Sequence, residues 1–122
     1  TDVGVRLPAH LTASGRAMLA QLPPEQIRAL YPDDSALSSR GGSPSTRRQL
    51  REVLRETRQR GFAIERGDVT AGLSSIAVPI LDRVGWPLAA LALTFPDSAG
   101  DGAELVADVA TAASDIARRL RV

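Results

Sequence analysis

The side chains that could do chemistry are few and lie in three short stretches. Ser74 and Ser75 open an apolar, strand-like run within residues 72–80, GLSSIAVPI, directly after a glycine. Glu65 belongs to an earlier run of strand character, and His10 is the only histidine of the chain. Hydroxyls at the entrance of an apolar strand either end the strand in water or line a small polar cavity.

These residues do not form a recognisable catalytic constellation. A serine hydrolase needs a histidine base beside its nucleophile, but His10 is the only candidate base and no G-x-S-x-G elbow is present. The chain has no cysteine, which excludes thiol nucleophiles, disulfides and cysteine-containing zinc sites. No second metal ligand accompanies His10, and no phosphate-binding loop is present. The sequence therefore predicts a protein that is not an enzyme and has neither metal nor cofactor.

Both titratable candidates also have a purely structural interpretation. His10 is expected to pack its ring against the fold at the entry to a helix. Glu65 would either pair on the surface with Arg66 or Arg83, or take a functional role, because it alternates with an apolar neighbour along the strand. The residues alone leave these two possibilities for Glu65 open.

Length and composition indicate one domain and a cytoplasmic location. A chain of 122 residues can bury one hydrophobic core, and 43% hydrophobic residues argue against disorder. No apolar run approaches the length of a membrane span, and no signal-peptide pattern opens the chain. Because the first residue is Thr1 and not methionine, we expect the chain to be a processed or truncated part of something longer.

The charge pattern argues against direct contact with nucleic acid. The net charge is only +1, and all fifteen basic residues are arginines. Six of them lie in residues 46–60, TRRQLREVLRETRQR, among two glutamates. On a helix this stretch has an apolar side formed by Leu50, Val53 and Leu54. A solvated helix face is therefore favoured over a nucleic-acid contact.

Periodicity and turn residues predict a chain of mixed helix and strand. Helices are expected over residues 11–22, 24–30, 46–60 and 102–121, with a loop over residues 33–45. Thr46 with Gln49 is a capping-box pattern, and Gly61 is a natural helix stop. The apolar stripe of the last helix is expected to pack on the sheet; it consists of Leu105, Val109, Ile116 and Leu120.

Three strands are expected over residues 62–66, 74–81 and 88–95, and a hairpin turn at residues 82–85 joins the last two. The third strand is apolar on both faces, which predicts a central, covered position in the sheet. The fold class is therefore predicted to be α+β, with a largely antiparallel sheet covered by helices.

Four stretches, in this order, resemble the effector-binding domain of IclR-type transcription regulators. Residues 4–20, GVRLPAHLTASGRAMLA, resemble that family's G-x-R-x-P-x-H-x-[ST]-x-x-G-[KR]-[AV]-x-L-A pattern. Residues 60–65, RGFAIE, look like its segment that ends in G-[YF]-A-x-[DE], and residues 72–79 are similar to its G-x-x-C-[IV]-A-x-P strand. Residues 89–96 look like the strand that follows the family's hairpin, and the end of the last helix matches as well.

This resemblance implies a GAF-like fold in which residues 1–122 form a partial effector-binding domain, without the family's DNA-binding winged helix-turn-helix. It implies sensing of a small organic or aromatic acid that modulates DNA binding through that separate domain. A homo-oligomer, dimer or tetramer, is expected, because missing strands leave an open sheet edge. The alternative is an oligomerisation or interaction module with a vestigial pocket.

The resemblance also implies a place for the effector. Backbone N–H groups at the start of the first helix would hold a carboxylate, and strand side chains would contact the rest of the ligand. Ser75 stands where the family usually has cysteine, and Ala92 where it often has serine, so no single effector is implied. The candidate effector-binding residues are Leu11, Thr12, Ala13, Ser14, Met18, Glu65, Leu73, Ser75, Ala92 and Thr94.

Overall fold

The computed structural model describes residues 3–37 and 43–120. Its helices are α1 (Ala13–Leu19), α2 (Pro24–Leu30), α3 (Arg47–Arg60) and α4 (Val106–Leu120), and its strands are β1 (Ala63–Arg66), β2 (Leu73–Leu81) and β3 (Pro87–Pro96). Short 3₁₀ turns lie at Ala9–Leu11, Asp34–Leu37, Asp97–Ala99 and Ala103–Leu105. The strands form an antiparallel sheet in the order β1-β2-β3, which confirms the predicted α+β class.

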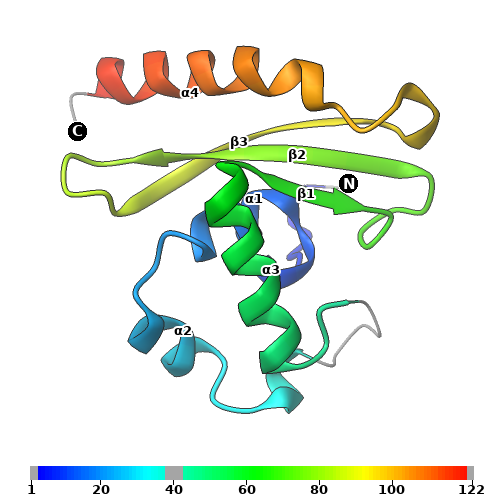
Figure 1. Ribbon diagram of the computed structural model, residues 1–122, viewed down its shortest axis with the longest axis vertical. Helices are drawn as coiled ribbons and strands as arrows, with labels where there is room; N and C mark the ends of the chain where they lie inside the picture. Colours follow the sequence, from blue (N-terminus) through cyan, green and yellow to red (C-terminus); the bar gives the residue numbers. More distant parts are fainter. Residues whose placement is uncertain (1–2, 38–42, 121–122) are drawn as a thin grey trace.

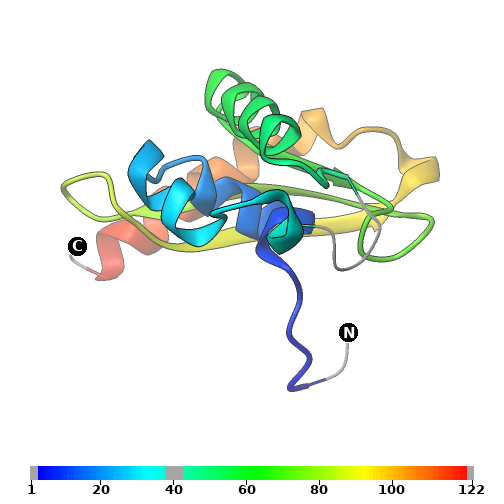
Figure 2. The same cartoon turned by 90° about the horizontal axis from the view of Figure 1, so that it is seen from below.

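Helices cover both faces of this sheet. Helix α4 runs along one face, and α1, α3 and α2 lie on the other side, with α2 farthest from the strands (Figure 1). Seen from below, α1, α2 and α3 lie in front of the sheet and α4 lies behind it (Figure 2). Helix α1 contacts all three strands, so its position relative to the sheet is well defined.

The period-2 alternation of the strands separates two packing surfaces. Small side chains form the surface against α1, which lets that helix approach closely; they are Ala13 and Ala17 of α1 with Ala63, Ala77 and Ala90 of the strands. Ile76 and Ile80 alternate to the face covered by α4, where Val109 and Ala113 are the buried helix residues. A further core cluster joins α1 to α3 and consists of Leu19, Ala20, Leu37, Leu50 and Leu54.

Helix α3 begins and ends where its capping residues predict. The Thr46 hydroxyl accepts the Gln49 N–H at 3.2 Å, and Gly61 ends the helix in the left-handed conformation, with φ of 86°. The Gln49 side chain accepts from the N–H of Ser45 at 2.8 Å and not from that of Thr46, so the capping box is displaced by one residue. The buried Leu50 and Leu54 confirm the predicted apolar side.

Helix α4 begins later than the sequence predicts. Gly102 has a positive φ of 75°, and a 3₁₀ turn precedes Val106, so the helix does not start at Gly102. The Asp101 carboxylate instead caps this turn by accepting the Ala103 N–H at 3.0 Å. At the other end Leu120 is 54% exposed, which means that the apolar stripe leaves the sheet before the helix ends. Residue 121 and part of the predicted loop 33–45 lie outside the described residues.

Strand β3 lies at an edge of the described sheet, so the prediction of a central position is wrong. The central strand is β2, and Leu88 and Leu93 of β3 are 44% and 38% exposed. The apolar sequence of a strand indicates that both of its faces are buried. It does not indicate the order of the strands, which depends on their pairing along each edge. Within the described residues, no helix combines the length and apolar character needed to cross a membrane.

Candidate functional site

A cavity of about 670 Å³ lies where the N-terminus of α1 meets the sheet. Its volume is in the range of small-molecule sites. The lining residues come from the segment before α1, the first turn of α1, the loop after β1, and all three strands: Val5, Leu7, Ala9, Thr12, Ala13, Ser14, Gly15, Glu65, Val69, Thr70, Leu73, Ser75, Ala92 and Thr94.

All the candidate effector residues except Leu11 and Met18 line this one cavity. Leu11 belongs to the 3₁₀ turn before α1 and is only 2% exposed in the core. Met18 lies in the last turn of α1, remote from the helix start, and is half-buried there. The apolar wall comes instead from Val5, Leu7 and Val69, together with the predicted Leu73.

The first turn of α1 supplies polar main-chain groups to the cavity. The Thr12 hydroxyl caps the helix by accepting the Gly15 N–H at 2.9 Å. The N–H groups of Ala13 and Ser14 have no acceptor within the helix, because the first residues of any helix lack a carbonyl four positions earlier. These donors suit a carboxylate or another small anion.

Gly15 allows the preceding segment to cross the start of α1. A Cβ atom on this residue would lie 2.0 Å from the carbonyl oxygen of Ala9, a distance that no side chain could adopt without moving the backbone. The close approach brings Leu7 and Ala9 to the wall of the cavity.

A row of polar side chains crosses the sheet on the cavity side. Glu65 of β1 is opposite Ser75 of β2, and Ser75 is opposite Thr94 of β3. The hydroxyl oxygens of Ser75 and Thr94 are hydrogen-bonded at 2.8 Å. Ser74 points to the other face, where its hydroxyl donates to the Asp97 carboxylate. Of the two serines that open β2, only Ser75 is therefore a cavity hydroxyl.

Glu65 is not a surface carboxylate. It is 4% exposed, and its Oε2 accepts the N–H of Asp68 at 2.8 Å. Among the residues that the structure describes, Oε1 of Glu65 has no hydrogen-bond partner. Every fully buried side-chain oxygen among these residues does have a partner, so Oε1 is not fully buried. Oε1 must therefore be in contact with the open cavity, where it can accept from a hydroxyl group.

Arg16, which the sequence did not mark as a site residue, links the elements around the cavity. It is 6% exposed and donates at 2.8–2.9 Å to three main-chain carbonyls, those of His10, Ser43 and Ile64. It also pairs at 3.1 Å with the Asp68 carboxylate. Because the N–H of Asp68 binds Glu65, Arg16 positions the cavity carboxylate through Asp68.

His10 packs inside the fold, which confirms its structural interpretation. Its Nε2 donates to the carbonyl of Leu37 at 3.1 Å, and its ring meets the Tyr31 ring edge-on, with centroids 5.9 Å apart. Burial lowers the pKa of His10 below its ordinary value of 6.5, and the charge of Arg16 lowers it further, whereas the bond to Leu37 acts in the opposite direction. In residues 3–37 and 43–120, no three histidine, aspartate or glutamate side chains gather into a possible metal site.

Comparison with known proteins identifies the fold. Residues 1–120 match the family model described as "Bacterial transcriptional regulator IclR C-terminal". The chain belongs to the IclR family. Its resemblance to these regulators is thereby confirmed, and transcription regulation is the family's function.

Curated relatives of this IclR-family chain are regulators of greater length. The chain is 31% identical over 103 residues to the HTH-type transcriptional regulator XynR of Escherichia coli (strain K12), which is 84% of this chain and 41% of XynR. It is 30% identical over 121 residues to the HTH-type transcriptional regulator KdgR of Dickeya chrysanthemi, which is 97% of this chain and 40% of KdgR. The chain thus spans about two-fifths of the length of these two relatives.

Solved structures place the IclR-family chain in the C-terminal part of such regulators. The Agobacterium tumefaciens repressor BlcR superposes with a TM-score of 0.86 and 31% identity, covering 98% of this chain and 50% of that one. The C-terminal domain of the E. coli transcriptional regulator KdgR superposes with a TM-score of 0.82 and 29% identity, covering 94% of this chain and 72% of that one.

Proposed function

We propose that this IclR-family domain binds a small organic or aromatic acid in the cavity at the N-terminus of α1. Binding modulates the DNA contact of a separate winged-helix domain, so that residues 1–122 serve as a partial effector-binding domain of a cytoplasmic regulator. The observation that supports this proposal is the convergence of the first-turn amides of α1 and the row of Glu65, Ser75 and Thr94 on one cavity.

The charges in the cavity select among acids. The N–H groups of Ala13 and Ser14 favour a carboxylate, each such helix-end interaction contributing roughly 0.3–1 kcal/mol when exposed and up to about 2 kcal/mol when partly buried. The carboxylate of Glu65 in the same cavity disfavours a second carboxylate, unless the ligand also offers a hydroxyl that can donate to Glu65. A hydroxy acid, a phenolic acid or an oxo acid therefore fits better than a simple fatty acid.

Calorimetry with a panel of hydroxybenzoates, benzoate and 2-oxo acids tests this proposal. Ser75→Val introduces a strong strand former but replaces the hydroxyl by two methyl groups, and we expect it to weaken binding of the acid at least tenfold. Glu65→Gln keeps an acceptor for the Asp68 N–H but removes the negative charge. It should therefore weaken the binding of a hydroxybenzoate and strengthen the binding of benzoate. The matched control is Ser114→Val, at an exposed position of α4, which should change neither affinity.

The alternative function is an oligomerisation module with a vestigial pocket. The free edge of β3, with its exposed Leu88 and Leu93, favours this reading, because unpaired strand edges recruit further strands. A homo-oligomer, dimer or tetramer, is proposed in either case. If no acid of the panel binds the wild-type protein while light scattering gives a dimer, the oligomerisation function is supported and the effector proposal is wrong. If Ser75→Val and Glu65→Gln both bind as wild type does, the effector site lies elsewhere.

A further inference from the structure

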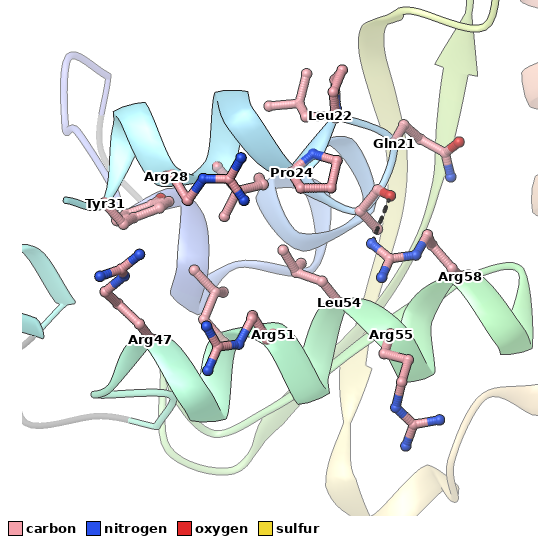
Figure 3. Close-up of a pocket in the computed structure, with 14 residues that line it drawn as sticks. Gln21, Leu22, Pro24, Arg28, Tyr31, Arg47, Arg51, Leu54, Arg55 and Arg58 are labelled. Carbon is pink, nitrogen blue, oxygen red and sulfur yellow. Dashed lines mark hydrogen bonds between the residues drawn. The ribbon is translucent and has the colours of Figure 1, made fainter. Parts of the chain in front are cut away.

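A second concave region lies between α2 and α3, and we call it the α2–α3 groove. Its volume is about 700 Å³, and it shares no lining residue with the cavity at the start of α1. Arg28 of α2 and Tyr31, which directly follows α2, face Arg47, Arg51 and Leu54 of α3 across it (Figure 3).

The floor of the groove is apolar. Leu50 and Leu54 of α3 are 1% and 2% exposed and belong to the core cluster between α1 and α3. Leu22, Ile27 and Tyr31 pack against that cluster from the other side and are only partly buried. The hydrocarbon that a ligand could cover is therefore that of Leu22, Ile27 and Tyr31, which lie over the buried leucines.

The rim of the groove is cationic. No aspartate or glutamate is among its lining residues, which include five arginines: Arg28, Arg47, Arg51, Arg55 and Arg58. Arg55 is paired with Glu52, whereas Arg47 and Arg58 donate to the carbonyls of Pro32 at 3.2 Å and Ala20 at 3.3 Å.

Arg28 and Arg51 differ from the other three arginines of the rim. Neither has a hydrogen-bond or ion-pair partner among the residues that the structure describes. They project from α2 and α3 respectively, so two guanidinium groups without partners flank one apolar floor (Figure 3). A guanidinium without a partner is a strong donor for a carboxylate, sulfate or phosphate group.

We propose that the α2–α3 groove binds an anionic amphiphile, with its hydrocarbon on the floor and its acidic group between Arg28 and Arg51. Helix α2 has seven residues and is about 10 Å long, which sets the length of hydrocarbon that the groove can cover. A partner helix would find room for only about two turns, too little contact area for a stable protein interface. Nucleic acid would leave the apolar floor uncovered, since its contacts are mainly to phosphates.

The experiment is an NMR titration of the full chain with decanoate, below its micelle concentration, and with decyltrimethylammonium as the cationic match. We expect saturable amide shifts on α2 and α3, none at Ser14 or Ser75, and at least tenfold tighter binding of decanoate than of the cation. Equal binding of both amphiphiles would show apolar adsorption alone. Shifts at Ser14 and Ser75 would show that decanoate binds in the effector cavity and not in the groove. Either result overturns the proposal, as does the absence of any shift.

Two double variants with the same change in net charge complete the test. Arg28→Gln with Arg51→Gln removes both guanidinium groups that lack a partner, and it should lower the affinity for decanoate at least tenfold. Arg48→Gln with Arg119→Gln removes two exposed arginines that do not line the groove and should leave the affinity unchanged. An equal loss in both variants, or binding there of an acidic amphipathic peptide but not of decanoate, would contradict an amphiphile site.

Discussion

Two buried polar residues, His10 and Arg16, fix the segment before α1 against the rest of the fold. His10 is 3% exposed and donates to Leu37, and its own carbonyl accepts from Arg16 at 2.9 Å. Burial removes a protonated imidazole from water and so lowers the pKa of His10, and the nearby guanidinium of Arg16 lowers it further. The folded chain therefore accommodates the neutral imidazole.

This pKa shift predicts a dependence of stability on pH. Because the folded pKa lies below 6.5, the unfolded chain binds a proton first as the pH falls, so stability is complete above about pH 6.5 and declines below it. Urea unfolding of the wild type should give a lower free energy of unfolding at pH 5.5 than at pH 7.5. His10→Gln should lower stability at both pH values but remove most of the difference between them.

His10 is the only histidine of the chain, so the pH comparison has few other contributors in this range. An equal free energy of unfolding at the two pH values in the wild type would contradict the buried, neutral His10. So would a difference that persists unchanged in His10→Gln.

The resemblance indicated the polar part of the candidate cavity, but not all of its wall. Residue types and alternation alone left Glu65 and Ser75 open between a surface and a cavity position, and the resemblance assigned both to one cavity together with the first-turn amides. Val5 and Val69 lie outside helices and strands, where no period indicates a direction. The role of Arg16 could not be predicted from the sequence, because its four acceptors are distant in the sequence or lie on the main chain.

At the scale of elements, Arg16 joins α1 to the carbonyl of Ile64 in β1, to Ser43 before α3 and to the loop after β1. A single planar guanidinium satisfies these acceptors, and a lysine ammonium cannot match the same fork of donors. The elements around the cavity therefore depend on one side chain for their relative position.

Substitution of Arg16 should consequently affect both stability and the cavity. We expect Arg16→Lys to lower the free energy of unfolding by about 3 kcal/mol or more, because buried carbonyls lose their donors. The exposed control Arg48→Lys should change it by less than about 0.5 kcal/mol. Arg16→Lys should also weaken acid binding, because Asp68 no longer holds Glu65. A loss of stability equal to that of the control would refute this assignment.

The elements themselves follow from local signals to different degrees. Helix α3 was predictable because Thr46 and Gly61 carry its caps in the local sequence. The start of α4 was not, because the conformation of Gly102 depends on its neighbours in space: a Cβ there would lie 2.6 Å from the ring of Phe95. The edge position of β3 was equally hidden, since strand order is decided by pairing and not by composition.

At the scale of the whole molecule, two concave regions of opposite character lie on the α1 side of the sheet. The cavity at the start of α1 presents helix amides, hydroxyls and one carboxylate, whereas the α2–α3 groove presents arginines over an apolar floor. The chain spans 50% of BlcR and 41% of XynR.

An NMR titration of the chain with the acid that binds best in calorimetry tests the effector site at the start of α1 most directly. We expect saturable shifts at the amides of Ala13, Ser14, Ser75 and Thr94, reduced in Ser75→Val and unchanged in Ser114→Val. Shifts confined to α2 and α3, or an acid panel from which no member binds, would contradict an effector site at the start of α1.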